Sequence, residues 1–99
     1  MALLKTSVTA DDIITIRTVQ GFEIVAKFVS ESASSIKVNK PLLVKGTSSV
    51  SDTGVVKALW EPIASTMEEL SDIEINSVNI LCANATSNDI ATQYTSQVS

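Results

Sequence analysis

FEIVAKF, residues 22–28, is the stretch that decides the fold class of this chain. Every second residue, beginning with Phe22, is apolar, and the charged Glu23 and Lys27 stand between them. Because the side chains of an extended strand alternate between two faces, this period of two predicts a strand with one face on a core. Gly21 stands directly before it and can adopt the positive φ of a tight hairpin turn. The stretch is therefore predicted to pair with residues 13–18, which show the same alternation.

Outward from this hairpin, the same alternation and the positions of Pro and Gly predict further short strands. Residues 46–54, GTSSVSDTG, are small and polar and are bounded by glycines, which predicts a loop. Pro41 cannot donate a ladder hydrogen bond, which predicts an edge, a bend or a bulge at that point. Ile90, Ala91 and Tyr94 are spaced to share one face of a short helix. The predicted strands are residues 13–18, 22–30, 35–44, 55–63 and 73–82.

Five short strands and one short helix in 99 residues predict an all-β fold, a small and strongly bent five-stranded antiparallel barrel with a short C-terminal helix. SH3-like, OB and Sm-like barrels all meet this description. We expect a single domain over residues 1–99, with the barrel at about 12–83 and a helix or tail at 84–99. The residues predicted to be buried are Phe22, Ile24, Phe28, Ile36, Val38 and Ile75.

The composition argues against enzymatic chemistry. The chain has no histidine, which removes His-based nucleophile systems and His-ligated zinc, and its one cysteine, Cys82, cannot form an internal disulfide. We expect Cys82 to be a small buried hydrophobe on a strand. The adjacent carboxylates Asp11–Asp12 and Glu68–Glu69 have no third ligand at a recognised spacing. The chain is therefore predicted to be a non-enzyme without cofactor or metal.

Charge and hydropathy bear on location and partners. No apolar run approaches the roughly 18 residues of a membrane span, and the N-terminus shows no signal-peptide pattern. We therefore expect no membrane partner and a cytoplasmic protein. The net charge is −4, yet all seven Lys and Arg residues lie before Ala58. This asymmetry is typical of a particle with two unlike faces, and equally of an acidic surface that only aids solubility.

Taken in order, the strands resemble those of the Sm/LSm family, the RNA-associated ring-forming barrels that include bacterial Hfq, and within it the Sm-like proteins of marine cyanophages. The resemblance covers about residues 12–83, and its phage-type members imply that the expected cytoplasm can be that of an infected bacterial host. It is carried by an apolar first strand, Gly21 at the hairpin, an apolar second strand, Glu31 where the family usually has Asp, and an apolar third strand. The second family motif, a strand ending in Ile-Arg-Gly before an apolar run, corresponds to Ile75-Asn76-Ser77 before Val78.

The resemblance also implies where nucleic acid would be bound. In Sm-like rings, nucleotides contact the turn between the second and third strands and the turn within the second motif. The corresponding residues here are Ser34, Ser35, Lys37, Asn76 and Ser77. Ser stands where the family has the base-contacting Asn, and Asn76-Ser77 stands where the family has Arg-Gly.

Two functions follow as expectations. The first is a homo-oligomeric Sm-like ring that binds single-stranded RNA or DNA around its pore and serves in nucleic-acid processing. The second is a phage-related structural or scaffolding ring that binds protein and no nucleic acid. An open barrel leaves strand edges unpaired, so we expect the edges of neighbouring copies to pair and close a ring.

Overall fold

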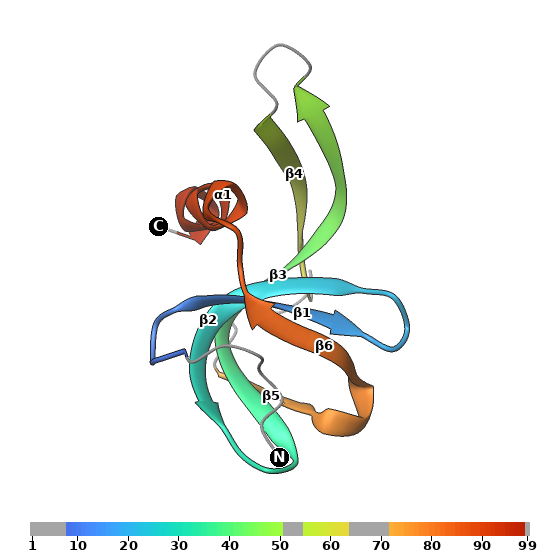
Figure 1. Cartoon of the computed structure of the whole chain (residues 1–99), viewed down its shortest axis with the longest axis vertical. Helices are drawn as coiled ribbons and strands as arrows, with labels where there is room; N and C mark the ends of the chain where they lie inside the picture. Colours follow the sequence, from blue (N-terminus) through green and yellow to red (C-terminus); the bar gives the residue numbers. More distant parts are fainter. Residues whose placement is uncertain (1–7, 51–54, 64–71, 99) are drawn as a thin grey trace.

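A computed structural model describes residues 8–50, 55–63 and 72–98 of the chain (Figure 1). Most of these residues lie in strands that form one strongly curled antiparallel half-barrel, with an α-helix at its C-terminal end. This arrangement confirms the predicted fold class. The elements are β1 (Ile13–Thr18), β2 (Glu23–Glu31), β3 (Ser35–Val50), β4 (Val55–Pro62), β5 (Ile73–Asn76), the 3-10 helix η1 (Ser77–Asn79), β6 (Ile80–Ala85) and α1 (Asn88–Val98).

β1 and β2 form the predicted hairpin. They pair antiparallel from Ile13 opposite Lys27 to Arg17 opposite Glu23. Gly21 closes the turn with φ of 97°, a left-handed conformation that glycine adopts without a Cβ clash. The Gly21 N–H donates to the Thr18 carbonyl oxygen at 3.0 Å. The turn therefore sets the register that places Ile16 beside Ile24 in the core.

β3 is longer than predicted, because it runs to Val50 rather than ending at residue 44. Its second part pairs with β4, with Thr47 opposite Ala58, and the two strands form an arm that projects from the curled part of the sheet (Figure 1). The loop predicted over residues 46–54 is therefore wrong for 46–50, and 51–54 lie outside the described residues. Thr, Ser and Val tolerate an extended backbone well once a partner strand completes their hydrogen bonds, and β4 is that partner.

Pro41 marks a bend in β3, as predicted. The register between β2 and β3 shifts at this point, between the pairs Val25–Leu42 and Lys27–Asn39. Lys40 has a φ of 50°, which is unusual for a residue with a Cβ. The bend divides β3 into a first half that pairs with β5 and a second half that pairs with β4.

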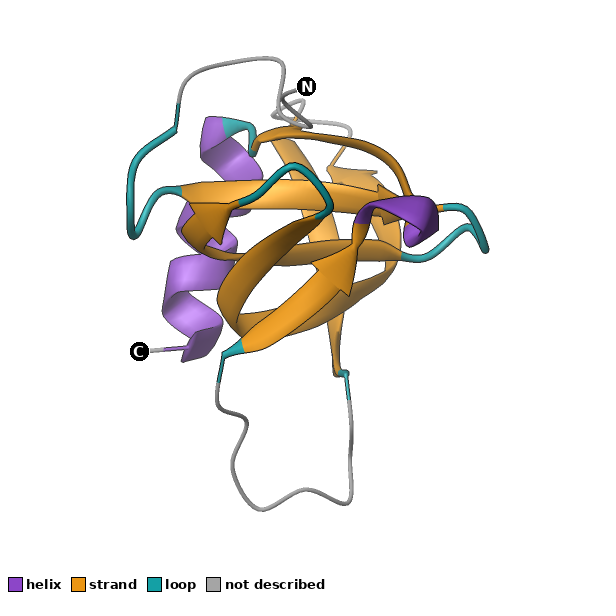
Figure 2. Ribbon diagram, turned by 90° about the horizontal axis from the view of Figure 1, so that it is seen from below, coloured by secondary structure: helices purple, strands orange, loops and turns teal. Residues whose placement is uncertain are grey.

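The predicted fifth strand, residues 73–82, is divided in two by η1. β5 pairs with the first half of β3, on the same side of β3 as β4, whereas β6 crosses to pair with β1 at the opposite end of the sheet. The order β4-β3-β2-β1-β6 therefore has β4 and β5 on one edge and β6 on the other. The short η1 connection brings these two edges together at one end and curls the sheet (Figure 2).

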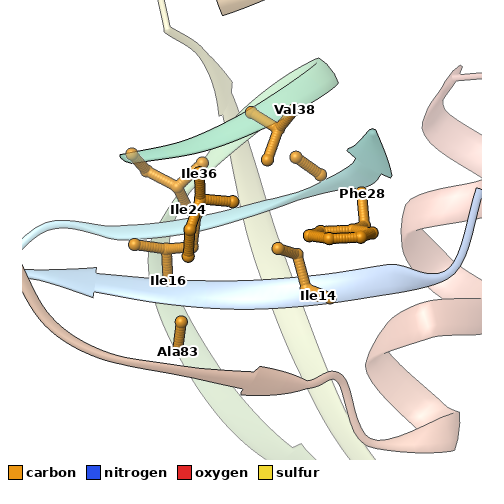
Figure 3. Packing of buried hydrophobic residues seen from close by; sticks show 8 residues of the cluster. Ile14, Ile16, Ile24, Phe28, Ile36, Val38 and Ala83 are labelled. Atoms are coloured by element: carbon orange, nitrogen blue, oxygen red, sulfur yellow. The ribbon is translucent and has the colours of Figure 1, made fainter. Parts of the chain in front are cut away.

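The core lies on the concave face of the sheet and combines residues from β1, β2, β3 and β6 (Figure 3). Four of the predicted core residues, Ile24, Phe28, Ile36 and Val38, are buried. Ile75 is half-buried and packs against the same cluster. The buried cluster consists of Ile14, Ile16, Ile24, Ala26, Phe28, Ile36, Val38 and Ala83.

Phe22 was predicted to be buried and is not, since its side chain is 56% exposed. It shares the alternation of Ile24, but it precedes β2, and the last β1–β2 pair is Arg17 with Glu23. An alternating pattern predicts which face of a strand a side chain lies on. It does not predict how far along the strand other core residues cover that face. Phe22 is therefore an apolar side chain on the core-facing side of the hairpin, beyond the end of the core.

Cys82 was also predicted to be buried and is exposed. The pairing of β1 with β6 shifts between Arg17 opposite Cys82 and Thr18 opposite Ile80, which leaves Leu81 without a pair of its own. Beyond this bulge the strand faces the other way from the prediction, so that Ala83 points into the core and Cys82 away from it. The predicted apolar side is therefore right for Ile80, which packs against the core cluster, and wrong for Val78 and Cys82.

α1 packs against the β3–β4 arm (Figure 1). Its Tyr94 is fully buried, its ring lies edge-on to that of Trp60 at 6.0 Å, and its hydroxyl donates to the Lys40 carbonyl oxygen. Burial raises the pKa of Tyr94 to about 12, and a backbone hydrogen bond from Lys27 lowers it by a smaller amount. Within the described part of the chain, no helix has the length and apolar character of a membrane span.

Candidate nucleic-acid interface

The turn between β2 and β3 is built by serine side chains. The Ser32 hydroxyl oxygen accepts from the backbone N–H of Ser35 at 3.1 Å and from that of Ser34 at 3.3 Å. The Ser32 N–H donates to the Ser35 carbonyl oxygen at 2.9 Å. Serine suits this position because its short hydroxyl can bond the backbone of the next residues in a tight turn. The turn leaves Ser34 exposed and Ser35 buried.

The second turn, from β5 into η1, is held by Asn76. Its side-chain oxygen accepts from the Val78 N–H at 3.1 Å, which caps the 3-10 helix. Asn76 has the extended backbone that is usual for the residue just before a helix. The strand therefore ends at Asn76, and the 3-10 helix begins with the next residue. The side-chain oxygen of Asn76, one of the polar atoms that this residue could offer to a nucleotide, is thus bonded within the chain.

The fold brings the two turns together. The Ser77 N–H donates to the Ser34 carbonyl oxygen at 2.7 Å, and Ser35 pairs with Asn76 in the β3–β5 register. Lys37 lies two residues along the same strand, opposite Glu74. All five residues predicted from sequence therefore lie in one cluster at the β3–β5 end of the half-barrel, which we call the turn cluster: Ser34, Ser35, Lys37, Asn76 and Ser77.

Acidic side chains lie beside the turn cluster and further along β3. The Ser35 hydroxyl donates to a carboxylate oxygen of Glu74 at 2.8 Å, so its proton is already used in a bond within the chain. Asn39, further along β3, donates from its side-chain amide to Asp72 at 2.7 Å. Because Glu74 is opposite Lys37, its negative charge offsets part of the field that Lys37 offers to a phosphate. Sequence reasoning missed this neighbour, because no pairing of residues 35–44 with residues 73–82 was predicted.

A second feature that sequence reasoning missed is an apolar hollow of about 250 Å³. It is lined by Thr18, Phe22, Ile24, Leu43 and Ile63. Four other large apolar side chains of the described residues are exposed: Val19, Leu59, Val78 at 75% and Leu81 at 64%. Apolar surface of this kind commonly marks contact with another protein chain. The alternation through Phe22 and Ile24 was the available signal, but alternation by itself does not distinguish a core residue from one that lines an open hollow.

Comparison with known proteins adds no assignment, because no family model matches the chain and no curated protein matches it.

Proposed function

We propose that this protein is a non-enzymatic, ring-forming Sm-like barrel whose turn cluster contacts single-stranded RNA or DNA. The observation that carries the proposal is the juxtaposition of the two turns, joined by the hydrogen bond between Ser77 and Ser34. In a ring, each subunit would present this cluster once, so that one Lys37 per subunit becomes a circle of positive charges. Such a circle would hold phosphates, while serine and asparagine groups meet base edges.

The two edges of the sheet support assembly. One edge is made by β4 and β5, and the other by β6. In the described residues, β5 pairs with β3 and β6 pairs with β1, so each presents its other side to a neighbour. An edge strand offers backbone N–H and C=O groups to a second chain. Pairing of β6 with the β4–β5 edge of the next copy is heterologous, and it closes a ring if the rotation closes.

A titration of labelled oligouridine and oligoadenine at two salt concentrations tests the binding proposal. We expect measurable affinity that falls steeply as salt rises, because contacts between Lys and phosphate release counterions. The oligonucleotides should be short enough to span one ring, so that binding reports the pore rather than aggregation. Absence of binding even at low salt, with the assembly intact, would contradict the nucleic-acid proposal and leave the second candidate.

The second candidate is a structural or scaffolding ring, which binds protein and no nucleic acid. Glu74 favours it, because this carboxylate accepts from Ser35 and lies opposite Lys37, two members of the turn cluster. The exposed Phe22 beside the apolar hollow favours it as well. In this second candidate the turn cluster is a structural junction of two turns, and the partner surface lies at the hollow.

Asn76→Ala separates the two candidates at the level of one residue. If bases meet the Asn76 amide, the variant should change the preference between oligouridine and oligoadenine more than the overall affinity. If Asn76 acts only as the cap of η1, the variant should cost about 1 kcal/mol of stability without changing base preference. Urea unfolding of both proteins, alongside the titration, measures the two effects separately.

A further inference from the structure

β4 is an edge strand whose outer side is partly occupied by the chain itself. The Ala58 N–H donates to the side-chain oxygen of Gln93, in α1, at 2.8 Å. Ala58 is opposite Thr47 in the β3–β4 ladder, so an N–H that bonds to the helix points away from β3. It belongs to the row of outward groups that a further strand would use. Pro62, four residues along the same row, has no N–H to offer.

The Gln93 contact is held in place by its neighbour. Tyr94 is fully buried, its ring packs edge-on against Trp60 of β4, and its hydroxyl bonds the Lys40 carbonyl oxygen of β3. These contacts fix α1 to both strands of the arm. Because α1 is fixed to the strands, the backbone that carries Gln93 is fixed too. The Gln93 amide is therefore held next to the edge of β4.

We propose that Gln93 guards the β4 edge, and that while α1 is docked it denies the Ala58 N–H to β6 of a second copy. β6 is the fitting occupant because it is the opposite edge of the same sheet. Its exposed Leu81 can also meet Leu59 of β4, which is 55% exposed. Covering an edge with a helix is an established way to prevent strand addition. With the Ala58 N–H occupied by Gln93, a neighbouring copy would have to pair with β5 or with the end of β4 that carries Trp60.

The guard does not depend on the proposed ring. If the ring forms, Gln93 restricts where β6 of the next copy can pair. If the chain is monomeric, Gln93 suppresses association along β4. In either case, loss of the acceptor oxygen should free the Ala58 N–H and lengthen the usable edge. The expected result is therefore a changed distribution of species, with larger species if the wild type is monomeric and an altered copy number if the wild type is a ring.

Three variants of the whole chain test the guard. Gln93→Met removes the amide oxygen while keeping the length of the side chain, and Gln93→Glu keeps an acceptor oxygen. Gln97→Met makes the same change at an exposed position of the same helix. Amide hydrogen exchange at Ala58 reports the hydrogen bond itself, and sedimentation velocity over a dilution series reports association.

We expect Gln93→Met to exchange the Ala58 amide about tenfold faster in dilute solution, where association is suppressed, and to sediment differently from the wild type at higher concentration. Gln93→Glu and Gln97→Met should behave as the wild type. Unchanged Ala58 exchange in Gln93→Met would overturn the guard. Faster exchange with unchanged sedimentation would overturn it too, because the edge would then be free without attracting a strand. If Gln93→Met fails to fold, Gln93→Ala takes its place, with the same two outcomes.

Discussion

At the residue scale, Lys37 is the cation on which the nucleic-acid proposal depends, since it is the basic member of the turn cluster. Lys37→Glu should weaken binding to every sequence and flatten the salt dependence, by a slope of about 0.7 for each single-strand phosphate that a lysine no longer neutralises. Lys57→Glu is the matched control, because Lys57 is an exposed lysine on β4 outside the turn cluster. Filter-binding or fluorescence anisotropy at several salt concentrations measures both slopes. If the two variants show the same affinity and the same salt dependence, Lys37 is not the lysine that contacts phosphate.

Tyr94 gives the protein a pH-dependent contribution to stability in the alkaline range. Its pKa rises from 10.0 to about 12 in the folded chain because burial disfavours the phenolate. A raised pKa means that the folded state holds the proton more tightly than the unfolded state. The contribution is therefore complete below about pH 10 and is lost as the pH rises towards 12. Urea unfolding over this range should show the free energy of unfolding falling more steeply in the wild type than in Tyr94→Phe.

At the element scale, β2 allows a matched comparison of two phenylalanines. Phe28 is 7% exposed within the core cluster, whereas Phe22 is 56% exposed just before the strand. Phe28→Ala should cost about 3–5 kcal/mol, because it removes transfer energy and leaves a cavity. Phe22→Ala should cost less than about 1 kcal/mol of stability. Chemical denaturation of both variants checks the difference, and similar losses would mean that Phe22 is packed after all.

Most of the strands could be predicted because alternation and turn residues are local signals. Gly21 and the residues on either side of it fix the first hairpin without reference to the rest of the chain. The length of β3 beyond Gly46 could not be predicted, because small polar residues become a strand only when β4 lies beside them. The facing of Cys82 depends on a bulge in the pairing with Arg17, which lies far away in the sequence.

At the scale of the whole molecule, the two edges of the sheet lead to a prediction about assembly. We expect a homo-oligomer of about five to seven copies, the range that the family resemblance suggests, closed by pairing of sheet edges. Sedimentation equilibrium or native mass spectrometry measures the copy number directly. A stable monomer at tens of micromolar would contradict the ring and, with it, the proposal of a circle of Lys37 side chains.

The candidate site could be predicted only in part. The five residues of the turn cluster come from two motifs that are far apart in the sequence, and the fold joins those motifs through Ser34 and Ser77. What sequence could not show is how their polar atoms are used. The Ser35 hydroxyl bonds Glu74 and the Asn76 oxygen caps η1, and both depend on three-dimensional neighbours. Motifs predict proximity better than they predict which hydrogen-bonding groups remain available to a ligand.

The pairing of β1 with β6 has a consequence for folding kinetics. Thr15 and Thr86, whose hydroxyls lie 2.8 Å apart beside that pairing, are separated by 71 positions in the chain. The hairpin of β1 and β2 can form as soon as both strands exist, whereas closure of the barrel has to wait for contacts of long sequence separation, which are slow to form. During synthesis, the edge of β1 that later pairs with β6 therefore has no partner strand until dozens of further residues have left the ribosome. In that interval, its apolar face is the surface that a chaperone, or another nascent copy, would meet first.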